Sequence, residues 1–119
     1  NKDITDSTII ILEKPEGHYK PSNEKDIYFY ATKGILDNNK QILELMENVV
    51  IESSKGTKFY TNRLIYIVEN NILSSNDNVT VDGSWGKLNG QGLIYNLEES
   101  TVILKGRPKL SLYNNKGNI

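Results

Sequence analysis

The sequence predicts an all-β fold, a coiled antiparallel sheet in which a unit of strand, turn, strand, turn and strand occurs twice. The first copy begins at Asn48 and reads NVVIESSKGTKFYTNRLIYIVENNILSS, and the second begins at Asn78 and reads NVTVDGSWGKLNGQGLIYNLEESTVILK. A period of roughly 30 residues is typical of stacked architectures, in which each unit buries its apolar face against its neighbours. Short β-branched and aromatic runs also alternate with turn residues at a spacing of about 10 residues, which is the pattern of all-β domains.

The strands expected before the repeats are Ile9–Leu12, Ile27–Thr32 and Gln41–Met46. Between the first two, Pro15, Gly17 and Pro21 predict an irregular segment over residues 13–26. Gly34-Ile35-Leu36 is expected to continue the second strand past a bulge. Asp37-Asn38-Asn39-Lys40 predicts a hairpin turn, because Asn and Asp tolerate left-handed backbone conformations. Gln41–Met46 contains good helix formers, but its shortness between two turn signals favours a strand.

Within the repeats, turns are expected at Ser53–Gly56, Asp82–Gly86, Glu69–Asn71 and Leu97–Ser100, and Lys105–Pro108 ends the second copy. Leu110–Tyr113 is the last expected strand. Successive strand residues point to opposite faces of a sheet, so the apolar positions that match between the copies define one face. We interpret this face as the interior. Its members are Leu43, Leu45, Val49, Ile51, Phe59, Leu64, Tyr66, Val79, Val81, Leu93 and Tyr95.

Composition excludes several classes of function. At 119 residues the chain is expected to form a single domain, residues 1–119. Its 14 Lys and Arg against 15 Asp and Glu give a net charge of −1, without the basic excess expected of a nucleic-acid-binding protein. The absence of cysteine excludes disulfides and thiolate metal sites. No segment approaches the roughly 20 apolar residues of a membrane-spanning helix. The first residue is not Met, so we expect a mature or trimmed fragment whose targeting segment lies outside this sequence.

No catalytic or metal-binding motif is recognisable, and no enzyme activity, cofactor or metal is predicted. His18 stands alone in the irregular segment, whereas a zinc or iron site needs several ligands. Glu98-Glu99 and the pair Glu44 and Glu47 are interpreted as solvated charges, because a glycosidase pair faces itself across a cleft. The glycines between Gly83 and Gly92 precede a strand and not the helix of a phosphate loop.

A basic cluster near the end of the chain consists of Lys105, Arg107 and Lys109. It is interpreted as a solvated loop, with contact to an anionic lipid head group or to the edge of a partner as the alternative.

The apolar and glycine positions also occur in the order of a known family. The residues that carry the likeness are Ala31 and Gly34, then Gln41 through Ile51, then Gly56, Phe59, Thr61, Leu64 and Tyr66, then Leu73 through Gly83, then Gly90, Gly92, Leu93, Tyr95 and Leu97. This series resembles the periplasmic domain of LptC and the related LptA (OstA-like) proteins over about residues 27–113. Its motifs are distributed along the chain and include no catalytic signature.

The resemblance implies an open, twisted antiparallel β-jelly roll (a β-taco) whose dry groove shields the acyl chains of lipopolysaccharide. The interior face listed above is then the lipid groove. Strand edges at Ile9, Ile11, Leu110 and Leu112 are expected to contact partners, because exposed edges can accept a further strand. The implied partners are lipopolysaccharide, an LptA-like bridge protein and an ABC transporter of the LptB/LptF/LptG type. The implied location is the periplasm, with anchoring to the inner membrane by an N-terminal helix that this chain lacks.

Two alternatives stay open. An LptA-like soluble bridge has the same fold and differs in how the full-length protein begins. A structural or carbohydrate-binding β-solenoid has a solid core and a working outer face, on which Trp85, Tyr60 and Tyr113 are the aromatic candidates. An enzyme that uses His18 or Glu98 is a more distant third.

Overall fold

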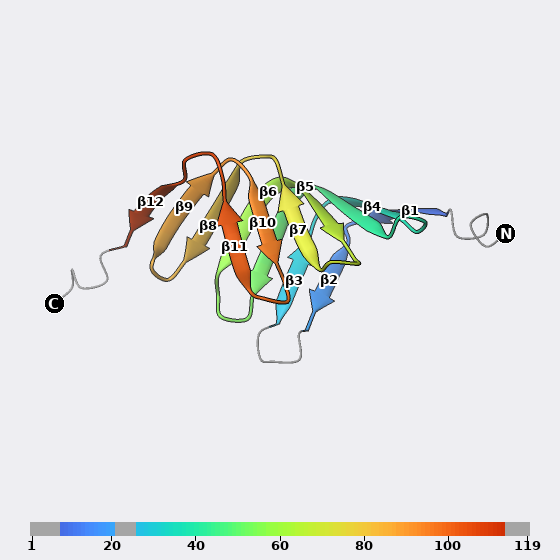
Figure 1. The fold of residues 1–119 in the computed structure, drawn as a ribbon, viewed down its shortest axis with the longest axis horizontal. Helices are drawn as coiled ribbons and strands as arrows, with labels where there is room; N and C mark the ends of the chain where they lie inside the picture. Colours follow the sequence, from blue (N-terminus) through green and yellow to red (C-terminus); the bar gives the residue numbers. More distant parts are fainter. Residues whose placement is uncertain (1–7, 21–25, 114–119) are drawn as a thin grey trace.

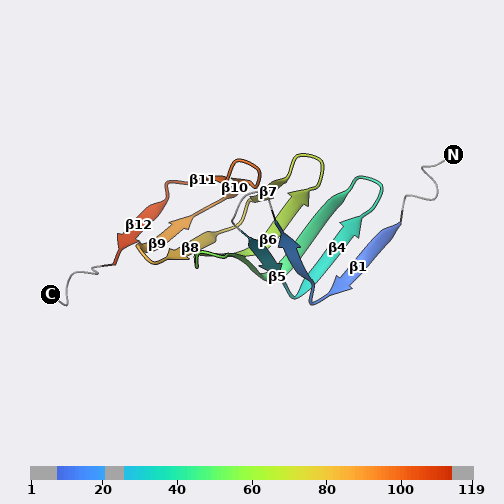
Figure 2. The same ribbon diagram turned by 90° about the horizontal axis from the view of Figure 1, so that it is seen from below.

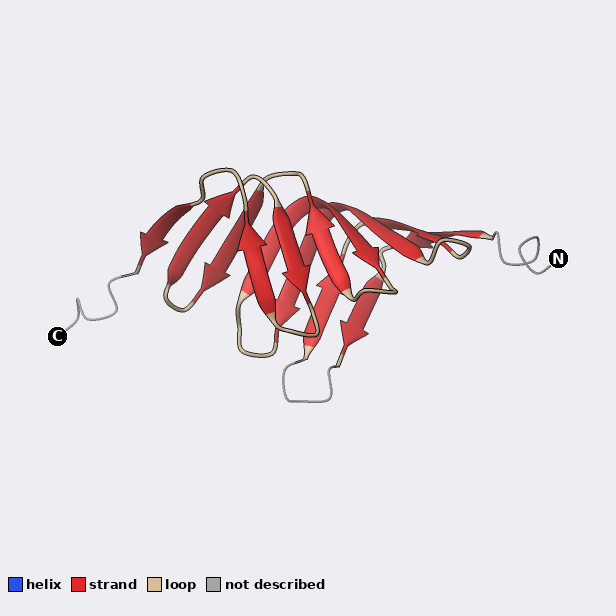
Figure 3. Ribbon diagram, viewed as in Figure 1, coloured by secondary structure: helices blue, strands red, loops and turns tan. Residues whose placement is uncertain are grey.

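The computed structural model describes residues 8–20 and 26–113, and within this part all regular structure is β-strand (Figure 3). The strands form one 12-stranded antiparallel sheet, which confirms the all-β prediction. No helix that could cross a membrane occurs in these residues. In chain order the strands are β1 Ile9–Glu13, β2 Glu16–Tyr19, β3 Ile27–Tyr30, β4 Lys33–Asp37, β5 Ile42–Ser53, β6 Lys58–Ile67, β7 Ile72–Ser75, β8 Val79–Gly83, β9 Gly86–Gly90, β10 Leu93–Asn96, β11 Thr101–Leu104 and β12 Lys109–Leu112.

The sheet folds into two walls because β5 and β6 are long enough to take part in both. Their outer ends form half-sheet A, in the order β1-β4-β5-β6-β7-β10-β11. Their ends near the β5–β6 hairpin form half-sheet B, in the order β2-β3-β5-β6-β8-β9-β12. The links from β7 to β8, β9 to β10 and β11 to β12 therefore cross between the walls, and they lie along one side of the molecule, the upper side in Figure 1. We call this line, where β5 and β6 bend and the links cross, the spine.

The bend of β5 is a local change of backbone conformation. The register with β6 shifts between Met46 and Val49, where Glu47 and Asn48 have φ values of 69° and 56°. Asn is among the residues that enter this left-handed region most readily, whereas a glutamate there is uncommon. The Glu47 carbonyl accepts a hydrogen bond of 2.9 Å from the Thr32 amide, at the break between β3 and β4. The expected strand through Leu36 is thus interrupted opposite this bulge.

On the other side of β6, the sheet forks. Residues Lys58–Tyr60 pair with β8, and residues Ile65–Ile67 pair with β7. Thr61 lies at the fork, where its hydroxyl is 3.0 Å from the Ser75 hydroxyl and donates to the Asn78 carbonyl at 2.9 Å. Ser75 is buried, and its hydroxyl also accepts the Asp77 amide at 3.1 Å. This small polar network ties the ends of β7 and β8 to β6.

The expected turns are present between the strands, but one expectation about their backbone is wrong. In the β4–β5 hairpin the left-handed residue is Gln41, with φ of 56°, and not an Asn or Asp. Asp37 instead stabilises this turn through its carboxylate, which accepts the amides of Asn39 and Lys40 at 3.1 Å. Asn71 and Ser100 have the same φ of 56° at the ends of the β6–β7 and β10–β11 turns. The final turn position thus sets the geometry in all of these hairpins.

The irregular segment expected over residues 13–26 is a further correction, although residues 21–25 lie outside the described part. Glu16–Tyr19 forms β2, which pairs with β3 along its whole length. The strand is not recognisable from the sequence because Gly17 leaves one inward position without a side chain, so the apolar alternation typical of a strand is missing. A Cβ at Gly17 would lie 3.0 Å from the Phe29 ring, so the ring covers the glycine and supplies the missing apolar contact.

His18 is accordingly a strand residue and not an isolated loop residue. Its ring stacks on Tyr28 with centroids 4.7 Å apart, and its Nε2 atom is 3.6 Å from the Asp26 carboxylate. The sequence does not reveal this carboxylate partner, because His18 and Asp26 meet only through the pairing of β2 with β3.

Candidate functional site

The inward faces of the two half-sheets form one apolar interior. All of the residues assigned to this face from sequence lie there: Leu45, Val49, Ile51, Phe59, Leu64, Val79, Val81, Leu93 and Tyr95 are buried, and Leu43 and Tyr66 pack against them. Ring pairs connect the walls, Phe29 with Tyr66 at 6.4 Å and Phe59 with Tyr95 at 5.4 Å between centroids.

Several buried residues were not among the assigned set, namely Ile27, Phe29, Leu73 and Leu97. Ile27 and Phe29 alternate with the exposed Tyr28 and Tyr30, so period-two alternation alone identifies them. Leu97 lies in the β10–β11 turn, where no strand pattern applies.

The interior is closed in its middle and open at the C-terminal end. Ile51, Leu64 and Leu93 have no exposed surface, as expected of a close-packed core. Beyond Phe59, however, a cavity of about 440 Å³ opens between the walls. We call it the terminal groove. Its lining residues are Thr57, Phe59, Val81, Trp85, Leu88, Val102, Leu104 and Pro108.

The terminal groove is open because few strands of either wall extend past it. Val102 and Leu104 come from β11, the last strand of half-sheet A, and point inward opposite Tyr95 and Leu93. Apart from Thr57 and the indole N–H of Trp85, the lining side chains are apolar. A concave, mostly apolar cavity of this size is typical of small-ligand sites, which span about 300–1,000 Å³.

Trp85 forms the rim of the terminal groove. It lies in the β8–β9 turn with 38% of its surface exposed. A Cβ at Gly83 would be 2.5 Å from the Trp85 Nε1 atom, so the indole lies directly over this inward-facing glycine. The expectation that Trp85 belongs to an outer aromatic face is therefore wrong. Tyr60 does point outward, and the Tyr113 hydroxyl donates to the Asp82 carboxylate at 2.9 Å.

Burial raises the pKa of two tyrosines of the interior. Tyr95 is 5% exposed and packs against Phe59, and burial raises the pKa of its hydroxyl above the usual 10.0. Burial is also the main cause of the raised pKa of Tyr66, whose hydroxyl donates to the Asn71 carboxamide oxygen at 2.8 Å. Both hydroxyls are neutral at pH 7.

The N-terminal end of the interior is almost filled. A cavity of about 70 Å³ remains there, lined by Leu12, Pro15, Glu16, Gly17, Phe29, Leu43 and Leu45. The two ends of the molecule, which Figure 2 shows with β1 at one extremity and β12 at the other, therefore differ in how far their walls are closed.

Each wall also ends in an open strand edge. Among the described strands, β1 and β2 have a neighbour on one side only at the N-terminal end, and β11 and β12 at the C-terminal end. The predicted edge residues lie in β1 and β12 and are exposed: Ile9 by 52%, Ile11 by 73%, Leu110 by 56% and Leu112 by 70%. Leu110 pairs with Leu88 and shares its inward face, whereas Ile9 and Ile11 alternate with the inward Leu12. Of the predicted edge residues, only those at the C-terminal edge lie on the inner face; at the N-terminal edge the inner face is continued by Ile10 and Leu12 instead.

The polar residues considered from sequence do not come together. Glu44 pairs with Arg63 across β5 and β6, and Glu98 accepts a hydrogen bond of 3.1 Å from Asn71. In the part of the chain that the structure describes, no group of three or more His, Cys, Asp or Glu side chains is arranged to hold a metal ion. The arrangement with a clear chemical use is the apolar terminal groove, which can shelter hydrocarbon from water.

A solved structure with a similar fold is that of LptH, described as the LptA-homologous periplasmic component of the lipopolysaccharide transport device of Pseudomonas aeruginosa. The match has a TM-score of 0.57 at 13% sequence identity and covers 92% of this chain and 98% of that chain. The likeness at this identity concerns the fold, an open antiparallel β-jelly roll. The search of curated proteins finds no match.

The family comparison reaches further than the fold. The model described as "Lipopolysaccharide-assembly, LptC-related" matches residues 2–113, a span that contains every strand described above. The chain belongs to the LptC-related family of lipopolysaccharide-assembly proteins.

Proposed function

We propose that this chain is a non-enzymatic component of lipopolysaccharide transport that holds lipid acyl chains in the terminal groove. The observation that carries the proposal is an apolar, outward-opening groove in a member of a lipopolysaccharide-assembly family. Each methylene group that such a groove removes from water contributes about 0.8 kcal/mol, so hydrocarbon favours this site over solution. The inner face from Leu43 to Tyr95 extends the same apolar surface along the molecule.

The open edges support a direction of transfer. A partner strand added to β11 or β12 would form main-chain hydrogen bonds with the free edge, as in other β-augmented complexes. Because Leu110 and Leu112 face inward at this edge, the partner's interior would continue the apolar path. We assign this end to an LptA-like bridge protein. The N-terminal end, with β1 and β2, faces the ABC transporter of the LptB/LptF/LptG type.

The location that follows is the periplasm, with attachment to the inner membrane through a helix outside this chain. A soluble, LptA-like bridge is the second candidate, and the fold likeness to LptH favours it. The first residues encoded by the full-length gene distinguish the two, since a bridge begins with a cleaved signal and an anchored component keeps its apolar helix.

The test is site-specific photo-crosslinking in cells at two neighbouring residues of β11. Val102 lines the terminal groove, and Ile103 points to the outer face with 59% of its surface exposed. A photoreactive phenylalanine analogue at 102 should form adducts with lipopolysaccharide, and the same analogue at 103 should not. The two positions share a strand and an edge, so position 103 controls for local folding and for incidental contact.

The proposal fails if the folded protein gives no lipid adduct at 102, or gives equal adducts at both positions. Equal labelling would mean that lipid meets the strand edge from outside and does not enter the groove.

A further inference from the structure

A polar groove follows the spine on the outer side of the sheets. It consists of two adjoining cavities of about 840 Å³ and 340 Å³, which share Asn78 and Gln91. We call it the spine groove. The larger cavity is lined by Asn48, Val49, Val50, Tyr60, Thr61, Asn62, Asn76, Asp77, Asn78 and Gln91, and the smaller adds Val79, Thr80, Asn89, Gly90, Gly106, Arg107 and Lys109.

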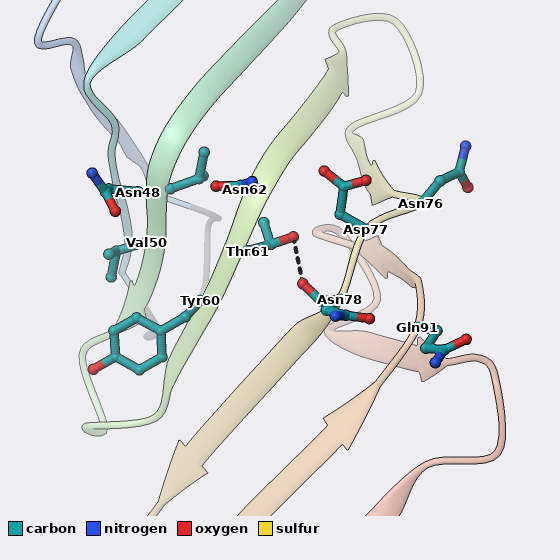
Figure 4. A pocket seen from close by; sticks show the side chains of 10 residues that line it. Asn48, Val50, Tyr60, Thr61, Asn62, Asn76, Asp77, Asn78 and Gln91 are labelled. Carbon is teal, nitrogen blue, oxygen red and sulfur yellow. Dashed lines mark hydrogen bonds between the residues drawn. The ribbon is translucent and has the colours of Figure 1, made fainter.

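The groove exists because the chain crosses between the walls here. Figure 4 shows Asn48 and Asn62 on one side of the larger cavity, where β5 and β6 run side by side. The β7–β8 link with Asp77 and the β9–β10 link with Gln91 form the other side. The hydrogen bond from Thr61 to the Asn78 carbonyl closes the floor between them.

Carboxamide side chains dominate the larger cavity, and the part of the chain that the structure describes leaves them free to bind a ligand. The amides of Asn48, Asn62, Asn76, Asn78 and Gln91 make no hydrogen bond to any described residue. Two other asparagines, one in the smaller cavity and one outside the groove, do make such bonds: the Asn89 carboxamide oxygen accepts from Thr80 at 2.8 Å, and that of Asn96 accepts the Glu99 amide at 3.0 Å. Each free carboxamide offers both donors and an acceptor, which matches the dual character of a sugar hydroxyl.

Tyr60 adds an aromatic face to this set. It is 40% exposed and stands on the outer face of β6, beside the carboxamides. An aromatic ring with a polar tip can cover the apolar C–H face of a pyranose while its hydroxyl stays hydrated.

The far end of the spine groove is cationic. Arg107 and Lys109 line the smaller cavity, and neither has an acidic partner within ion-pair distance among the described residues. Unpaired cations beside a polar groove favour a carboxylate or phosphate through charge-assisted hydrogen bonds. The basic cluster noted in the sequence is therefore partly a wall of this groove.

We propose that the spine groove binds an acidic oligosaccharide, with sugar rings along Tyr60 and the carboxamides and an anionic group at Arg107 and Lys109. Two sources share this chemistry, the saccharide part of lipopolysaccharide and the soluble fragments of the cell wall. Tyr60 lies on the opposite face of the sheet from Phe59 of the lipid site, because the two residues are neighbours along β6.

The test is a titration of the isotope-labelled protein, followed by NMR of the backbone and side-chain amides. The probes are a delipidated, phosphate-bearing core oligosaccharide of lipopolysaccharide, a disaccharide muropeptide with free carboxylates, and neutral maltohexaose. We expect saturable shifts of the carboxamide signals of Asn62, Asn78 and Gln91 with at least one acidic probe. Maltohexaose should bind about tenfold more weakly, a difference of about 1.4 kcal/mol.

Substitutions in the spine groove distinguish binding at this site from nonspecific binding to the protein surface. Tyr60→Ala and Lys109→Glu should each weaken binding of the acidic probe by about tenfold or more. Lys40→Glu, at an exposed turn outside the groove, is the matched charge control and should leave binding unchanged. Unaltered backbone spectra of each variant verify that the fold is kept.

Binding of one acidic probe alone identifies its source, and binding of both supports the chemical class. The proposal is overturned if no acidic probe shifts the carboxamide signals of the folded protein, if the neutral and acidic probes bind equally, or if Lys40→Glu weakens binding as much as Lys109→Glu. Shifts confined to the terminal groove would likewise overturn it without affecting the proposed lipid site.

Discussion

Replacing Thr61 by valine removes one hydroxyl from the fork between β7 and β8 while keeping the volume and branching of the side chain. The hydroxyl makes two contacts, at 3.0 Å to the Ser75 hydroxyl and at 2.9 Å to the Asn78 carbonyl. Water can replace the second, because Asn78 is exposed. Ser75 is 4% exposed, so its hydroxyl loses a partner that water cannot readily replace, although it still accepts the Asp77 amide.

The expected loss for Thr61→Val is about 1–2 kcal/mol of the free energy of unfolding, the usual cost of leaving one buried polar group short of a hydrogen bond. With a urea dependence of about 2 kcal/mol per molar, typical of small proteins, the unfolding midpoint should fall by roughly 0.5–1 M. Unfolding in urea followed by circular dichroism measures this shift. Thr80→Val is the matched control: its hydroxyl bonds Asn89 on the exposed outer face, so the midpoint should hardly change.

A double-mutant cycle with Ser75→Ala isolates the contact itself. If Thr61 and Ser75 form one network, the two losses should fall short of additivity by about 0.5 kcal/mol or more. Strictly additive losses, or a midpoint for Thr61→Val equal to that of the parent protein, would refute the idea that this hydroxyl holds the fork.

Three further predictions concern the interior. Gly83→Ala places a methyl group where the indole of Trp85 lies, so the ring should swing outward and the emission of this sole tryptophan should shift to longer wavelength; an unchanged spectrum contradicts the rim position. Val102→Glu should abolish retention of lipopolysaccharide by the immobilised protein, whereas Ile103→Glu, one residue away on the outer face, should retain it. The pKa of the Tyr95 hydroxyl is raised in the folded protein, so the unfolded chain releases the hydroxyl proton at a lower pH than the folded protein does. The free energy of unfolding should therefore fall as pH rises above about 10. The measurement is the urea midpoint of the parent protein and of Tyr95→Phe at pH about 8 and about 10.5. The midpoint of Tyr95→Phe should fall less between these two pH values than that of the parent. An equal fall would assign the pH dependence to other groups.

Alternation of side chains along strands was enough to find most of the interior. Val49 and Ile51 in one copy and Val79 and Val81 in the other are all buried, because each lies in a strand with one face toward the core. The same reasoning failed where a side chain is missing: Gly17 occupies an inward position of β2, and a pattern of apolar side chains cannot register a strand whose contact is made by a neighbour's ring.

The split into two half-sheets could not be predicted from the sequence, for a different reason. The sequence of residues 58–67 does not indicate that the first part of β6 pairs with β8 and the last part with β7, because both partner strands follow later in the chain. The terminal groove depends on this split and on Trp85 lying over Gly83, a side-chain direction that turn propensity does not specify. The family resemblance implied a groove but could not give its position at one end.

The shared strands have a mechanical consequence. Every ladder other than β5–β6 lies wholly within one wall, so the walls can move apart about the spine without breaking any of those ladders. What opposes the motion is contact between inner side chains, such as Phe29 with Tyr66 and Phe59 with Tyr95. A guest hydrocarbon that takes the place of these contacts restores much of the lost apolar burial. If lipid enters as proposed, the interior can therefore widen around it while the main-chain hydrogen bonds of these ladders are kept.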